Sequence, residues 1–143
     1  MNHSVEWETQ IQNYDKQLVT IEELRSKQLE KYILKQSGLT KEMEQLLDRY
    51  MQEIKRRLTL LKAPEEQLVM LNTIIEIEYV DDGFIDTYSI VAPEEIDPEQ
   101  GKISLLSPVG SQLLLAPLHE QIELSTPAGK MTIRVISIKP QLA

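Results

Sequence analysis

The chain of 143 residues contains no cysteine, which excludes disulfide bonds, thiolate metal sites and cysteine nucleophiles. Its two histidines, His3 and His119, lie far apart in the sequence and lack a cysteine or carboxylate at the spacing of a zinc site. Aromatic residues make up only 5% of the chain. The sequence has no Ser-His-Asp arrangement, P-loop or dinucleotide-binding glycine motif. These absences leave few groups for enzymatic chemistry and predict no resident metal.

Long apolar runs are also missing. No stretch approaches the roughly 18 apolar residues of a membrane-spanning helix. The first ten residues, MNHSVEWETQ, have neither the basic region nor the apolar core of a signal peptide. We therefore expect a cytoplasmic protein without a membrane partner.

The charge of the chain is unevenly distributed. The composition, 41% hydrophobic and 27% charged, is typical of a globular protein. Residues 1–62 carry 11 basic and 10 acidic side chains, whereas residues 63–143 carry 4 basic and 13 acidic ones. The second half would repel a nucleic-acid backbone, but it could meet a basic protein surface.

The first 62 residues have the pattern of two helices. Residues 4–36 contain no glycine or proline, and Ser4 is a suitable helix N-cap. Apolar residues recur at the alternating spacing of four and three that is typical of a coiled-coil seam, at Trp7, Ile11, Tyr14, Leu18 and Ile21. Such a helix would be about 50 Å long and would need a partner to cover this stripe.

A second striped helix follows a short break at Ser37-Gly38. Thr40 is its expected N-cap, and its apolar stripe comprises Leu39, Met43, Leu46, Tyr50, Ile54, Leu58 and Leu61. Two striped helices joined by so short a break predict an antiparallel coiled-coil hairpin. The alternative is a coiled-coil dimer in which the first helix pairs with that of another chain. We favour the hairpin and a monomer.

From residue 68 the pattern changes to that of strands. Ile75, Ile77 and Tyr79 alternate with more polar neighbours, and Asp81-Asp82-Gly83 predicts a turn into a second strand. The other expected elements are strands at 103–106, 122–124 and 131–138 and a short helix at 111–115. We therefore predict an α+β protein, with a helical hairpin over residues 1–65 and a small antiparallel sheet domain with one short helix over residues 66–143.

Two stretches of this second half, VAPEEIDPEQGKISLLSPVGSQLLL and STPAGKMTIRVISI, resemble the C-terminal domain of the Gre transcript-cleavage factors of bacterial RNA polymerase. The family pattern is matched at Val91, Pro93, Glu95, Asp97, Gly101, Ile103, Ser104, Ser107, Pro108, Gly110, Leu113, Leu114, Thr126, Pro127 and Gly129. It is not matched at Ala116 or at Leu118-His119-Glu120, where the family usually has glycine and then Gly-Asp. The resemblance implies an FKBP-type fold for the domain.

The resemblance also implies a partner surface. In the family, the corner between the third strand and the helix lies on the face that grips the polymerase at the rim of its secondary channel. Here that corner is Ser107, Pro108, Val109 and Gly110. Pro and Gly at a strand-to-helix corner are also ordinary turn chemistry, so the two interpretations can hold together.

In Gre factors the hairpin enters the secondary channel, and an Asp-x-x-Glu pair at its tip holds the second catalytic Mg²⁺. The tip here is Gly38, Leu39, Thr40 and Lys41. If Leu39 is placed on the family's leucine, then Gly38 and Lys41 stand where the carboxylates belong. The only acidic alternatives nearby are Glu42 and Glu44, whose spacing on a helix points them about 200° apart. Mg²⁺ is therefore expected only if this tip acts in the polymerase active site.

The stretch from Leu68 to Thr73 resembles Rnk, the regulator of nucleoside diphosphate kinase, a Gre homologue that binds polymerase without the acidic pair. A basic cluster, Lys55, Arg56 and Arg57, lies near the base of the second helix. It could contact nascent RNA or an acidic polymerase surface, or it could simply be a solvated helix face.

Together, the motifs favour a bacterial-type transcription elongation regulator that binds RNA polymerase and is not itself an enzyme. Three alternatives stay open. One is a true cleavage factor that uses Glu42 or Glu44, another is an FKBP-like prolyl isomerase, and the third is a coiled-coil adaptor unrelated to transcription. The low aromatic content argues against the aromatic-lined pocket of an isomerase.

Overall fold

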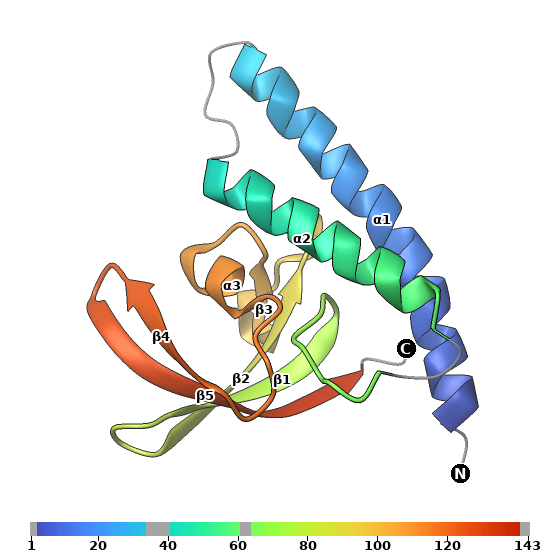
Figure 1. The fold of residues 1–143 in the computed structure, drawn as a ribbon. Helices are drawn as coiled ribbons and strands as arrows, with labels where there is room; N and C mark the ends of the chain where they lie inside the picture. Colours follow the sequence, from blue (N-terminus) through green and yellow to red (C-terminus); the bar gives the residue numbers. More distant parts are fainter. Residues whose placement is uncertain (1–2, 34–40, 61–63, 141–143) are drawn as a thin grey trace. The chain divides into compact units, whose positions relative to one another are not determined.

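A computed structural model describes residues 3–33, 41–60 and 64–140 (Figure 1). The chain forms two compact units, Met1–Pro64 and Glu65–Ala143. The first unit contains two helices, α1 (His3–Ile33) and α2 (Lys41–Leu58). The second contains a five-stranded sheet and one short helix. This confirms the predicted α+β class. Within the described ranges, no helix is long and apolar enough to cross a membrane.

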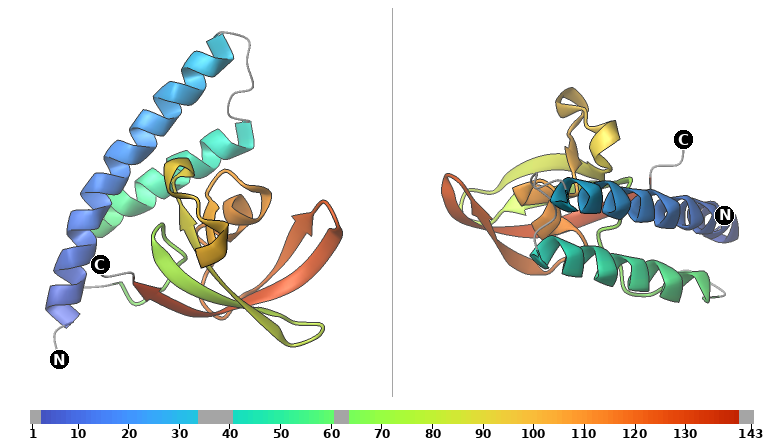
Figure 2. Two further views of the ribbon diagram at one scale, coloured as in Figure 1. Left: turned by 180° about the vertical axis from the view of Figure 1, so that it is seen from behind. Right: turned by 90° about the horizontal axis from the view of Figure 1, so that it is seen from above.

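The helices α1 and α2 pack side by side as a hairpin within one chain (Figure 2). The apolar stripes predicted from the sequence supply many of the buried residues, namely Tyr14 and Ile21 on α1 and Leu46, Tyr50 and Ile54 on α2. Leu24, Leu47 and Met51 are buried beside them. The hairpin prediction is therefore confirmed.

Polar groups connect the two helices at defined positions. Tyr50 Oη donates to Gln17 Oε1 at 2.6 Å, and both side chains are buried. Nearer the hairpin tip, Arg25 forms an ion pair with Asp48 at 2.7 Å. The buried Tyr50–Gln17 pair is satisfied in only one alignment of the helices, so it favours a single register.

The carboxylate of Glu53 accepts hydrogen bonds from two arginines of the same helix, α2. Arg56 Nη2 and Arg57 Nε each donate to Glu53 Oε2 at 2.7 Å. Partial burial acts to raise the pKa of the Glu53 carboxyl, but the hydrogen bonds and attraction of Arg56 and Arg57 outweigh it and hold the pKa below its usual value. Ionised Glu53 therefore stabilises the hairpin.

This contribution should depend on pH. It is fully present above the unfolded-state pKa of about 4.3 and is lost as the pH falls through the lower folded-state pKa. We expect the stability difference between the wild type and Glu53→Gln to be constant near neutral pH and to shrink below about pH 4.3. Thermal unfolding followed by circular dichroism at 222 nm would measure it, with exposed Glu44→Gln as the control. A difference that stays constant down to pH 2 would contradict this role for Glu53.

The second unit is a curled sheet with strand order β3-β2-β1-β5-β4. Its core lies between the sheet and α3, where the side chains of Ile75, Ile77, Leu113, Leu124, Ile133 and Val135 are almost fully buried. The elements are β1 (Thr73–Tyr79), β2 (Phe84–Val91), β3 (Lys102–Ser104), α3 (Pro108–Leu113), β4 (Gln121–Thr126) and β5 (Gly129–Pro140).

One pairing differs from the predicted antiparallel sheet. β3 runs parallel to β2, from Ser89 opposite Lys102 to Val91 opposite Ser104, so the sheet is mixed. Parallel neighbours need a crossover connection rather than a hairpin. The loop at residues 92–101 provides it through two short 3-10 turns, Pro93–Glu95 and Pro98–Gln100.

The connection after α3 keeps a backbone that favours glycine although glycine is absent. Leu115 and His119 have φ angles of 68° and 71°, a left-handed conformation that costs a non-glycine residue about 1–2 kcal/mol. Their backbone N–H groups donate to Val69 O and Val135 O, each at 2.7 Å. These hydrogen bonds hold the two residues in place. Leu115 precedes Ala116, and His119 is itself a position where the sequence departs from the Gre pattern.

Candidate functional site

The corner between β3 and α3 is fixed by the side chain of Ser107. Ser107 Oγ accepts from the backbone N–H of Gly110 at 2.9 Å and donates to Ser104 O at 2.7 Å. Ser107 is thus the N-cap of α3, and Pro108 takes the first helical position, where its missing N–H costs nothing. Because the helix starts at this cap, it begins at Pro108 rather than at the predicted residue 111.

Gly110 allows the helix to lie against the end of β3. A Cβ atom at this position would be 2.1 Å from Ser104 O, closer than atoms can approach. Pro108 lies on the outside of the same turn and is exposed, and Val109 is half-buried. The corner is therefore a rigid turn that presents Pro108 to the surface.

Gln112 ties this corner to the edge of the sheet. Its Nε2 donates to Pro108 O and Ser125 O, both at 2.7 Å, and Ser125 N donates to its Oε1 at 2.8 Å. The amide thus occupies the backbone groups of β4 as a neighbouring strand would. Sequence reasoning missed Gln112, because no spacing or motif distinguishes it from other polar helix residues.

The tip of the hairpin is only partly described. Gly38, Leu39 and Thr40 lie outside the described residues, and Lys41 is the exposed first residue of α2. Glu42 and Glu44 are exposed in the first turn of that helix, where a spacing of two residues turns their side chains about 200° apart. In the part of the chain that the structure covers, no three acidic or histidine side chains are grouped to hold a metal.

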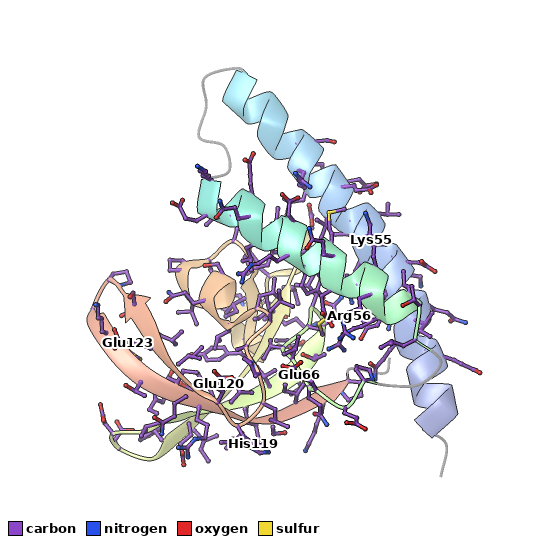
Figure 3. The ribbon with its side chains drawn as sticks, in the orientation of Figure 1. Lys55, Arg56, Glu66, His119, Glu120 and Glu123 are labelled. Carbon is purple, nitrogen blue, oxygen red and sulfur yellow. The ribbon has the colours of Figure 1, made fainter. Side chains whose placement is uncertain are left out.

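The predicted basic cluster is divided. Lys55 and Arg56 are exposed on α2 (Figure 3), whereas Arg57 is buried. Arg57 Nη1 donates to Tyr14 Oη at 3.2 Å, and its Nε is bonded to Glu53. The inclusion of Arg57 in a surface patch is therefore wrong, because its guanidinium belongs to the seam of the hairpin. Lys55 and Arg56 are left as the surface cations of this cluster.

Comparisons with known proteins identify relatives of the second unit. The family described as "Transcription elongation factor, GreA/GreB, C-term" matches residues 64–140. A transcription elongation factor GreA from Solidesulfovibrio magneticus is 40% identical over 70 residues, which are 49% of this chain and 43% of that protein. A GreA from Bacillus cereus is 35% identical over 75 residues, which are 52% of this chain and 48% of that protein. The match thus spans about half the length of these curated relatives.

A solved structure is similar to a larger part of the chain. The prokaryotic transcription elongation factor GreA/GreB from Nitrosomonas europaea superposes with a TM-score of 0.50 and 25% identity, over 65% of this chain and 78% of that one. The matched family residues include the whole of the β3–α3 corner.

Proposed function

Since this chain belongs to the GreA/GreB family of transcription elongation factors, we propose that it binds bacterial RNA polymerase. In this proposal the sheet unit docks at the rim of the secondary channel through Ser107–Gly110, and the helical hairpin enters the channel. The observation that carries the proposal is the β3–α3 corner. It lies within the family match, it is held by the Ser107 cap, and it exposes Pro108. A surface held this firmly loses little entropy on binding.

We further propose that the protein regulates polymerase by occupying the channel and not by stimulating RNA cleavage. Gly38 and Lys41 offer no carboxylate at the tip, and a weakly held Mg²⁺ needs oxygen ligands. The diverging side chains of Glu42 and Glu44 do not supply a substitute pair. The protein itself is then no enzyme and has no cofactor. The exposed side chains of Lys55 and of Arg56, which also pairs with Glu53, would contact nascent RNA or an acidic polymerase surface.

The test uses backtracked elongation complexes with Mg²⁺ and a cleaving Gre factor. Rising concentrations of this protein should give no cleavage alone and should suppress cleavage by the other factor. Pro108→Ala should weaken the suppression about tenfold, since exposed anchors at an interface contribute above 1 kcal/mol. Pro127→Ala, at an exposed proline in the β4–β5 turn, is the matched control and should have no effect. Failure to suppress, or equal weakening by both variants, would contradict the proposed docking.

A further inference from the structure

A second surface lies at the other end of β2, at its turn with β1. The only three aromatic residues of the sheet unit are Tyr79, Phe84 and Tyr88. Tyr79 is opposite Phe84 in the strand register, so these two side chains share one face of the sheet. Tyr88 shares it too, because alternate residues of a strand point the same way. All of the unit's aromatic side chains are therefore on one face of one hairpin.

Asp86 stands between these aromatic residues on the same face. Its Oδ2 accepts from Tyr79 Oη at 2.7 Å and from Tyr88 Oη at 3.4 Å. Both hydrogen bonds use one oxygen, which leaves Oδ1 for another donor. Among the described side chains, no lysine or arginine forms an ion pair with Asp86. Arg134 pairs with Glu78 and Lys130 with Glu123. The tyrosines hold a carboxylate in place without neutralising its charge.

Phe84 is the most exposed large apolar side chain in the described part of the unit, with 68% of its surface accessible. It lies two residues from Asp86, so the two side chains are roughly 7 Å apart along the strand. A planar guanidinium fits such a pair, because it stacks on an aromatic face and donates hydrogen bonds to a carboxylate. Nearby Asp81 and Asp82 are exposed in the turn and add negative charge.

The backbone of β2 is open beside this group. β3 pairs with β2 only from Ser89 to Val91, and Ser89 N donates to Gly101 O on that side. Alternate residues of a strand present their N–H and C=O to the same neighbour. The backbone N–H and C=O of Ile85 therefore point to the same side as those of Ser89, and no strand of the described chain lies next to them there. Ile85 is itself 49% exposed. An uncovered edge of this kind accepts an added strand.

The free edge of β4 differs from the open part of β2 that precedes Ser89. On β4 the amide of Gln112 occupies both backbone groups of Ser125, which blocks pairing there. A second copy of the chain is a poor occupant of the β2 edge, since pairing of β2 with itself would bring Asp81, Asp82 and Asp86 of both copies together. Like charges at such distances repel. Charge therefore favours a basic partner.

We propose that this end of the β1–β2 hairpin docks an arginine-bearing extended segment of a partner protein. The segment adds to the free edge of β2 at Ile85 and places a guanidinium between Phe84 and Asp86. This surface is at the opposite end of β2 from the strand that leads to Ser107, so it goes beyond the polymerase contact proposed above and is tested separately from it.

The probe is a blocked hexapeptide of alternating arginine and threonine, added to the full ¹⁵N-labelled chain. We expect saturable shifts of the backbone amide signals of residues 84–88, and none with a peptide that carries glutamate in place of arginine. Asp86→Asn keeps an oxygen for both tyrosines but removes the charge, and it should weaken binding at least about tenfold. Asp81→Asn removes the same charge from the same hairpin and should change the affinity less than about twofold.

Ile85→Pro tests the strand addition, because it removes an N–H that faces the open side and leaves the pairing with β1 intact. It should abolish the shifts. Equal weakening by Asp86→Asn and Asp81→Asn would indicate unspecific attraction and overturn the proposal. Shifts centred on Ser107–Gly110, absence of binding at millimolar peptide, or a dimer in sedimentation that Ile85→Pro dissociates would each overturn it as well.

Discussion

The double variant Gly38→Asp/Lys41→Glu is expected to stimulate RNA cleavage in backtracked polymerase complexes on the order of 100-fold above the unchanged protein. The resemblance to the Gre factors places these two residues where the family has the carboxylates that hold the second Mg²⁺. A correctly placed metal stabilises a transition state by several kcal/mol, so restoring its ligands should have a large effect even if the geometry is imperfect.

The measurement is the rate of shortening of end-labelled RNA in stalled complexes, at saturating protein and several Mg²⁺ concentrations. Gly38→Asn/Lys41→Gln is the matched control, since it has nearly the same shape without the negative charges. Only the carboxylate variant should stimulate RNA cleavage by the polymerase, and the cleavage rate should rise with the Mg²⁺ concentration. Suppression of another factor's activity should be similar for both variants, because the proposed entry of the hairpin into the channel does not depend on these charges.

The competing interpretation gives a different pattern. If the unchanged protein already stimulates cleavage, and Glu42→Ala or Glu44→Ala abolishes it, then the tip holds a metal through α2 and the occupancy proposal is wrong. If neither the unchanged protein nor the double variant stimulates RNA cleavage or competes with a cleaving Gre factor, the proposed entry of the hairpin into the channel is wrong.

How much of this could be predicted from the sequence depended on the range of the interactions. The helical stripe through Leu46, Tyr50 and Ile54 and the alternation of Ile75 and Ile77 report local burial, and both were predicted correctly. These patterns arise because one face of each element is turned to a core. The Ser107-Pro108 corner was also predictable, since capping is a local effect.

What the sequence did not show depends on contacts between distant residues. The parallel pairing of β3 follows from the path of the loop at 92–101, which no periodicity describes. Arg57 resembles its exposed neighbours Lys55 and Arg56 in the sequence, yet a rotation of about 100° per residue turns it toward Tyr14 on the other helix. The open edge at Ile85 became visible only once the strand order was known.

Gly110→Ala is the second change with a large expected effect. The added methyl would stand 2.1 Å from Ser104 O and 2.9 Å from Ser107 Oγ. The first of these atoms is backbone that also accepts from Ser107 N, so it cannot move without breaking the corner. We expect the free energy of unfolding of the sheet unit to fall by about 3 kcal/mol, the upper part of the range for overpacked buried sites.

Hydrogen exchange of the β1 and β5 amides reports on the unfolding of this unit directly. Tryptophan fluorescence would not, because Trp7 lies in the helical unit. Gly83→Ala is the matched control. It makes the same chemical change at a φ of 76° with nothing within 4 Å, so it should cost only the backbone strain of about 1–2 kcal/mol. A loss of stability for Gly110→Ala no larger than this would show that the corner can adjust to the added methyl group.

The variants Pro108→Ala and Gly110→Ala together separate the effect on stability from the effect on binding. Pro108→Ala should leave the amides protected and weaken only the proposed polymerase contact. Gly110→Ala should reduce both the protection and the contact, because Gly110 acts through the fold that presents Pro108.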